Sequence, residues 1–318
     1  MTSVRLATLA DTATIVEIYS SHHPGWQRLD PDGKMAVTPY ADLSLYERWQ
    51  RGGHWMSIET GAVHLNRLLA GSGVPLVAED DEGHVLAEAE IYESHEPAPF
   101  GHHLNIGAIV THADYLRRDF GAVLVKYILE MARLMKCERV TASHNSARDF
   151  FMAQGFRHTR SGRGVRLPAQ EGRAFYQATE LTERSPEQVK GWLMALGRYQ
   201  SSRQEWERLF PQDWAAGIPE LLNQAVAHVK LTVTGQNAIL YLYESVGSDQ
   251  QQIQPGEVML ACWSARPLSN PLLTAVRDRV FRDGYQSFLT FVMDADLPQL
   301  GPDAQPTDYT QDFYEMPV

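Results

Sequence analysis

Apolar residues alternate with polar ones along some stretches of the first 170 residues and recur every three or four residues along others. Alternation predicts strands and the longer spacing predicts helices. The predicted strands are 4–8, 74–79, 84–92, 104–110, 139–142 and 155–167. The first predicted helix is capped by Asp11. Further helices are predicted at 43–50, 59–69, 121–135 and 146–154. Runs of strands flanked by helices indicate an α/β layered domain of about 165 residues.

The second half of the chain repeats this order of elements less clearly. Strands are expected at 175–181, 229–233, 238–243, 257–263, 287–293 and 309–316. Helices are expected from Ser185 through Leu193, over 206–227 with a break at Pro211, and over 270–281. A long-period repeat of this kind predicts a duplicated domain. The alternative is that two α/β segments share a common order by chance.

Composition narrows the class of protein without naming a substrate. The chain has 318 residues, of which 44% are hydrophobic and 21% charged, so a globular protein of two domains is expected. The net charge of -11 argues against a nonspecific binder of nucleic acid or of anionic membranes. The only cysteines, Cys137 and Cys262, are too few for a disulfide framework or a cysteine-based zinc site. We expect a cytoplasmic protein, because no apolar run reaches spanning length and no signal pattern opens the chain.

The most informative stretch is a predicted strand, a loop and a helix between residues 104 and 135. A helix start exposes unpaired N–H groups and a partial positive charge, which together bind phosphate. Arg117 and Arg118 add counter-charge, and Gly121 lets the backbone approach closely. The alternative for the arginines is a solvated basic turn. Residues 1–170 carry a net charge of -3 against -8 for the rest, so an anionic cofactor is expected in the first half.

These residues resemble the GNAT family, the acetyl-CoA-dependent N-acyltransferases. The family's loop, Arg/Gln-x-x-Gly-x-Gly/Ala, is matched at Gly121, while Leu116 and Asp119 depart from it. A second family motif is matched at Asn145, Ala147, Phe150, Gly155 and Phe156. The resemblance covers residues 1–168. It implies a mixed, mostly antiparallel central sheet flanked by helices, here in two copies.

The resemblance also implies how the copies divide the work. We predict an acyl-CoA-binding domain at 1–170 and a degenerate GNAT-like domain at 171–318 without a pyrophosphate loop, because Pro267 and Pro271 remove N–H donors there. The cofactor is expected to be acetyl-CoA. The residues implied to hold it are Ile109, Val110, Thr111, Arg117, Arg118, Asp119, Phe120, Gly121, Ala122 and Asn145. An N-cap role is the alternative for Asn145.

In such enzymes the acceptor is an amine that must lose a proton, and the resemblance implies a primary amine of a small molecule. No metal, nucleic acid or membrane partner is expected, and a homodimer is compatible with the family. The family's frequent acid, a tyrosine, is replaced by Phe151, and its frequent base, a glutamate, by Asn105. His103 and His144 lie nearby in the sequence, and imidazole titrates near neutral pH.

Alternatives remain open for the site and for the function. Exposed loop ends are the alternative for both histidines. Glu88, Glu90 and Tyr92 are expected on an exposed sheet face, with a role in the cleft as the alternative. An acyl-CoA-binding protein with little or no catalysis would explain Phe151 and Asn105 equally well. A scaffold in which neither domain binds a cofactor is the third reading.

Overall fold

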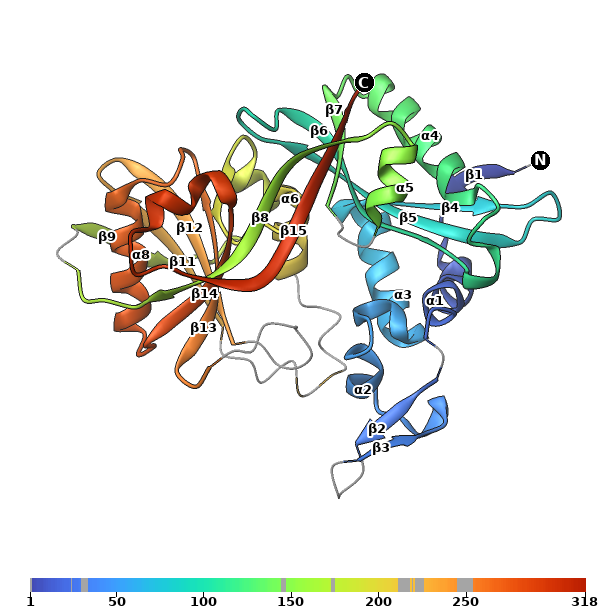
Figure 1. Cartoon of the computed structure of the whole chain (residues 1–318), viewed down its shortest axis with the longest axis horizontal. Helices are drawn as coiled ribbons and strands as arrows, with labels where there is room; N and C mark the ends of the chain where they lie inside the picture. The colour runs from blue at the N-terminus through green and yellow to red at the C-terminus, as the bar shows by residue number, and fades with distance from the viewer. Residues whose placement is uncertain are drawn as a thin grey trace. The chain divides into compact units, whose positions relative to one another are not determined.

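The computed structural model describes residues 2–23, 25–29, 34–143, 147–172, 175–210, 218, 220, 226–244 and 254–318. The chain divides into two compact units (Figure 1). The first unit contains residues 1–92, 106–136 and 212–223, and the second contains 93–105, 137–211 and 224–318. Strands β5 (Val85–His95) and β6 (His102–Thr111) run through both. The predicted boundary at residue 170 separates the two copies of the repeated domain, not these two compact units. That boundary stays a prediction.

The first unit is built on a sheet in the order β1-β4-β5-β6. Strand β1 (Ser3–Leu6) pairs antiparallel with β4 (Val74–Glu79), and β4 pairs antiparallel with β5. Strand β5 is buried at every position from 85 to 92, so both faces of the sheet are covered there. The strands predicted from the alternation of apolar and polar residues are therefore confirmed. Their ends differ from the predicted ends by at most three residues.

Helices cover this sheet with the apolar faces that their spacing predicted. Helices α1 (Thr12–Ser20) and α3 (Ile58–Arg67) bury Ile15 and Leu65 in one cluster with Val77 of β4. Helix α4 (Phe120–Leu134) packs on β1 and β4, and its buried residues recur every three or four positions. The short elements of this unit are the hairpin β2 (Gln27–Leu29) and β3 (Met35–Val37), helix α2 (Leu45–Trp49), the 3-10 turns Leu9–Asp11, Tyr40–Asp42, Gly53–Met56 and Ala113–Tyr115, and a π-helical turn at Leu68–Ser72.

The second unit contains most of the remaining strands in the order β7-β15-β8-β14-β13-β12-β11-β9. Helix α8 (Asn270–Arg282) shares an apolar cluster with one face of this sheet, and α6 (Ser202–Leu209) shares another with the alternate residues of the same strands. The bounds are β7 (Arg139–Ser143), α5 (Arg148–Ala153), β8 (Arg157–Pro168), β9 (Tyr176–Glu180), β10 (Leu193–Leu196), β11 (Val226–Val233), β12 (Gln236–Tyr243), β13 (Glu257–Ser264), β14 (Ser287–Met293) and β15 (Gln305–Pro317), with 3-10 turns at Pro186–Val189 and Asp294–Leu300.

The order of elements confirms the duplication. Along the chain β9, β11, β12, β13, α8 and β14 repeat the series β1, β4, β5, β6, α4 and β7, and the sheet neighbours repeat in the same way. The last strand of each copy pairs with the other copy. Strand β8, the last of the first copy, pairs with β14, and β15, the last of the second copy, pairs with β7 and β8 (Figure 1). Among the described residues, no helix is long and apolar enough to span a membrane.

Strand β10 corrects the helix expected from Ser185 through Leu193. Only a 3-10 turn forms at its start, and Leu193–Leu196 is a strand that pairs antiparallel with β13. The backbone is already extended at Lys190 and takes a positive φ of 77° at Gly191, which ends a right-handed helix, and pairing with β13 then makes the following residues a strand. The helix expected at 206–227 is also wrong at its C-terminal end, because strand β11 begins at Val226. Residues 211–217, 219 and 221–225 lie outside the described part of the chain.

Strand β10 also fills a gap in the second sheet. Strand β13 pairs in parallel with β14 only from Glu257 to Met259, and β10 takes over as its partner at Cys262–Ser264. On the other side, the N–H of Gly197 donates to the carbonyl of Phe291 in β14 at 2.7 Å. The diverging strands of the second copy are therefore bridged by a segment of the chain itself.

Gly197→Ala is expected to destabilise the protein far more than Gly191→Ala. Both glycines have positive φ, so both substitutions incur the left-handed penalty of about 1–2 kcal/mol. A Cβ at Gly197 would lie 2.7 Å from Cα of Ala261, whereas nothing lies within 4 Å at Gly191. Overpacking should add about 1–3 kcal/mol at Gly197 only. Denaturant unfolding of the two variants measures the difference, and equal losses would show that β10 is not tightly packed on β13.

Candidate active site

The first unit presents a loop between β6 and α4 that is anchored at its start. The Nε2 atom of His22 lies 2.8 Å from the carbonyl oxygen of Thr111, and the Ala113 N–H donates to Oγ of Ser21 at 2.9 Å. The N–H of His112 donates to the carbonyl of Leu86 at 2.9 Å. The loop therefore leaves β6 in a defined direction, held by the end of α1 and by β5.

The N-terminus of α4 has no side-chain cap. Asp119 occupies the N-cap position with φ 57° and ψ 5°, the left-handed region, and its carboxylate accepts no capping hydrogen bond. Glycine favours this conformation, and aspartate is among the few other residues that adopt it. The first helical bond is donated by Val123 to the carbonyl of Asp119. The N–H groups of the first turn are thus unused within the helix and suited to an anion.

The two arginines of this loop are exposed. The Arg118 guanidinium lies 5.0 Å from the centre of the Tyr115 ring. Neither Arg117 nor Arg118 has a carboxylate partner among the residues that the structure describes. Within β6, Ile109, Val110 and Thr111 are half-buried, whereas positions 103–106 are buried. A positively charged, uncapped helix start therefore follows a strand whose last residues are partly open to solvent.

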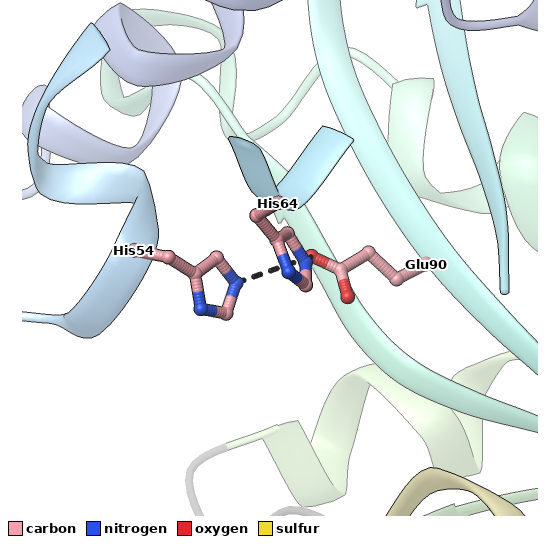
Figure 2. A group of neighbouring side chains, drawn as sticks. All are labelled: His54, His64 and Glu90. Carbon is pink, nitrogen blue, oxygen red and sulfur yellow. Dashed lines mark hydrogen bonds and ion pairs between the residues drawn. The ribbon is translucent and has the colours of Figure 1, made fainter. Parts of the chain in front are cut away.

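A buried carboxylate lies on β5 in the same unit (Figure 2). Oε1 of Glu90 accepts a hydrogen bond from Nε1 of Trp55 at 2.6 Å and lies 2.9 Å from Nε2 of His64. Oε2 accepts from the Tyr92 hydroxyl at 2.7 Å. Nε2 of His54 lies 3.7 Å from Oε1. The neighbouring histidines and their hydrogen bonds hold the pKa of Glu90 well below its usual range despite the cost of burial. Burial lowers the pKa of His54 to about 4.

Glu88, two residues earlier on the same strand, is buried in a different environment. Its Oε2 atom accepts a hydrogen bond from the Tyr19 hydroxyl at 2.9 Å, and its Oε1 atom has no hydrogen-bond partner. Burial, with the nearby Glu90 charge, raises the pKa of Glu88 well above its usual range. The expectation that Glu88, Glu90 and Tyr92 face solvent is wrong: all three are at most 4% exposed, because α1 and α3 cover this face.

The apolar surroundings of this carboxylate reach the strand that enters the loop. Val110 packs, partly buried, on the cluster that contains Trp55 and Tyr92, the two residues that donate to Glu90. The end of β6 therefore packs on the same apolar cluster as two of the residues that donate to Glu90. The alternation along β5 placed Glu88 and Glu90 on one face of the strand. Nothing local in the sequence indicated that His54 and His64 lie beside Glu90.

The predicted catalytic residues of β6 lie in the second unit. His103 is fully buried, with Nδ1 3.0 Å from the Gly101 carbonyl and Nε2 3.6 Å from Glu96, and burial lowers its pKa. Asn105 accepts a hydrogen bond from the Thr141 hydroxyl at 2.9 Å and donates to Oε1 of Gln204 at 2.5 Å. His144 and Asn145 lie outside the described residues.

Residues 35–156 match the model of the acetyltransferase (GNAT) family. The match covers less than half of the chain, and the likeness of the whole chain to GNAT proteins is one of fold. Three solved structures with this fold are GCN5-related N-acetyltransferases from Anabaena variabilis ATCC 29413 and Kribbella flavida, and Eis1 from Mycobacterium abscessus. Their identities to this chain are 10%, 10% and 14%, and their TM-scores are 0.64, 0.58 and 0.53.

The three alignments cover 99–100% of this chain and 72%, 71% and 74% of those chains. At these identities the likeness concerns the fold alone. No curated protein matches the chain significantly. For residues 35–156, the match to the GNAT family implies acyl transfer that depends on acyl-CoA.

Asp119→Gly is expected to strengthen CoA binding. The substitution removes a negative charge beside the proposed anion site, where repulsion between two exposed unit charges is about 1 kcal/mol at ~4 Å, or up to about fivefold in affinity. It also removes the left-handed penalty at φ 57°. Asp119→Asn should give the gain in affinity without the gain in stability. Titration calorimetry with CoA measures the effect, and Asp114→Asn, exposed in the same loop, serves as the control. Unchanged affinity in both Asp119 variants would contradict a phosphate site here.

Proposed function

We propose that this protein is an N-acyltransferase that transfers the acetyl group of acetyl-CoA to a primary amine of a small molecule. The observation that carries the proposal is the uncapped α4 N-terminus, with left-handed Asp119 at the position of the family's first loop glycine. It lies within the matched residues 35–156. Bound acetyl-CoA supplies an activated acyl thioester.

In this proposal each part of the loop has a defined task. The N–H groups of Phe120, Gly121 and Ala122 bind the pyrophosphate, and Arg117 and Arg118 neutralise its charge. The backbone of Ile109, Val110 and Thr111 binds the pantetheine arm through β-type hydrogen bonds, and Asn145 contributes from the second motif. Holding cofactor and amine together provides much of the rate.

The second copy is proposed to bind no cofactor, and two observations support this. Its corresponding helix, α8, is capped by its own Ser269, whose hydroxyl accepts the Leu272 N–H, and Pro271 lacks an N–H. The divergence of β13 from β14 is bridged by β10 and Gly197. Both the anion-binding end and the inter-strand gap are therefore occupied by the chain itself.

A second candidate function is acyl-CoA binding with little or no catalysis. Phe151, at the position of the family's acid, is 2% exposed and stacks on Tyr314 with ring centres 5.9 Å apart. Asn105, at the position of its base, is engaged by Thr141 and Gln204. A thermal-shift experiment with acetyl-CoA tests binding, and thiol release over a panel of amines separates an enzyme from a binding protein. Binding without thiol release for any amine would favour the second candidate.

Arg117→Ala with Arg118→Ala should weaken acetyl-CoA binding, and the loss should shrink as salt is added, because the contribution of exposed charges is screened. Titration calorimetry should give one site per chain for the wild type. Arg133→Ala, which removes an exposed arginine from the other end of α4, is the control and should leave affinity unchanged. Two equivalent sites per chain would refute the single-site proposal.

For the proton transfers we propose His103 or His144 as the base. Removing a general base costs about 10²-fold or more. His103→Ala or His144→Ala should therefore lower thiol release strongly at neutral pH, and less at alkaline pH, where the free amine is already abundant. Because His103 is fully buried, the melting temperature of its variant is measured alongside, and His84→Ala, on an exposed turn, is the control. Full activity of both folded variants across this range would rule out the histidine assignment.

A further inference from the structure

Three potential metal ligands converge in the first unit, and acyl transfer assigns them no role. His54 comes from the 3-10 turn Gly53–Met56, His64 from α3 and Glu90 from β5 (Figure 2). One ligand atom from each lies within 4.8 Å of the other two. Figure 2 shows both imidazole rings directed at the same carboxylate. The three residues come from distant parts of the sequence, so packing of the unit creates the group.

The spacing of these atoms suits a small tetrahedral cation. Zinc bonds of about 2.0–2.1 Å at tetrahedral angles put neighbouring ligand atoms roughly 3.3–3.4 Å apart. Oε1 of Glu90 lies 2.9 Å from Nε2 of His64 and 3.7 Å from Nε2 of His54. The two distances fall on either side of the zinc value, so shifts of a few tenths of an ångström would accommodate the ion.

The carboxylate is oriented by groups outside the trio. The indole N–H of Trp55 donates to Oε1, which also lies within hydrogen-bond distance of His64, and the hydroxyl of Tyr92 donates to Oε2. A bound ion would take the place of the contact between Oε1 and His64. Such outer hydrogen bonds fix ligand orientation at metal sites, and their loss typically weakens metal binding. Glu90 and His64 are buried, while the His54 side chain is 31% exposed, so the group opens to solvent on one side.

The charge of the group favours a cation. A buried ionised carboxylate needs a compensating positive charge. The rings of His54 and His64 have centres 3.4 Å apart, so both imidazoles lie beside the same carboxylate. A single metal ion would engage both imidazoles and the carboxylate together. We propose that His54, His64 and Glu90 bind one divalent transition-metal ion of the zinc class, with its fourth position open to solvent.

A second group of similar residues provides the matched control. Glu93, His95 and His102 in the second unit also have ligand atoms within 4.8 Å of one another. Glu93 and His95 are 42% and 38% exposed in their side chains, so their charges are solvated without an ion. His54→Ala and His95→Ala each remove one partly exposed imidazole, and they differ in the group they affect.

Zinc titration of the chelator-treated protein tests the proposal. Wild type should bind zinc by calorimetry and should gain thermal stability from it. His54→Ala should weaken the tighter site at least about 10-fold, the size of effect found even for outer-shell changes, whereas His95→Ala should leave it unchanged. Visible absorption of the cobalt-substituted protein should report tetrahedral nitrogen and oxygen ligands in wild type and in His95→Ala.

No zinc uptake by wild type would overturn the proposal, as would loss of the tight site in His95→Ala with retention in His54→Ala. Both variants change partly exposed side chains, and circular dichroism of each confirms that it is folded before titration. Acetyl-CoA binding is measured on the same samples. The two proposals are independent, so a failure to bind zinc leaves the cofactor result interpretable and a failure to bind acetyl-CoA leaves the zinc result interpretable.

Discussion

Buried backbone N–H and C=O groups must find hydrogen-bond partners, and this requirement shapes both copies of the fold. In a parallel pair joined by a crossover helix, the partner strand satisfies these groups only as far as the two strands stay together. In the second copy β13 and β14 stay together for three residues, from Glu257 to Met259. Beyond that point β10 pairs with β13, and Gly197 donates to β14. In the second copy, backbone groups of the chain itself therefore pair with β13 and β14 beyond this point.

The first copy meets the same requirement differently at the start of its crossover helix. Ser269 accepts an N–H of the first turn of α8, whereas Asp119 accepts none from α4. The left-handed backbone of Asp119 directs the chain into α4 without a capping side chain, and the N–H groups of that turn remain for an anion. In the function proposed above, the two copies differ in whether the chain or a ligand completes them, and a duplicated domain would in this way divide structural and binding roles.

Buried charges form a second common feature of both units. In the first, Glu90 is surrounded by donors from Trp55, Tyr92 and His64. In the second, the fully buried Glu96 pairs with Arg198 and accepts the N–H of Ser202. Removing one partner of such a pair costs about 3–5 kcal/mol, because the other charge remains buried. These groups therefore constrain how helices and turns pack on the strands that carry the carboxylates.

The sequence by itself determined the regular elements whose patterns are local and strong. The periodicity of α4 and α8, the strands at 74–79 and 287–293, and the duplication all follow from spacing that one face of an element must satisfy. The phosphate-type loop was also visible, because a strand, two arginines, a glycine and a helix follow one another in the chain. The residues of this candidate site are contiguous, so no knowledge of tertiary contacts is needed to group them.

Only the tertiary structure decided what depends on partners far along the chain. The apolar run at 193–196 is short enough to suit a helix or a strand, and pairing with β13 selects the strand. Alternation placed Glu88 and Glu90 on one face of β5 but did not reveal whether that face meets water or protein. It is buried because Tyr19, Trp55 and His64, between 26 and 69 residues before the carboxylates that they contact, pack over it. Burial of a charge is a property of its surroundings, and those surroundings exist only after the chain has folded.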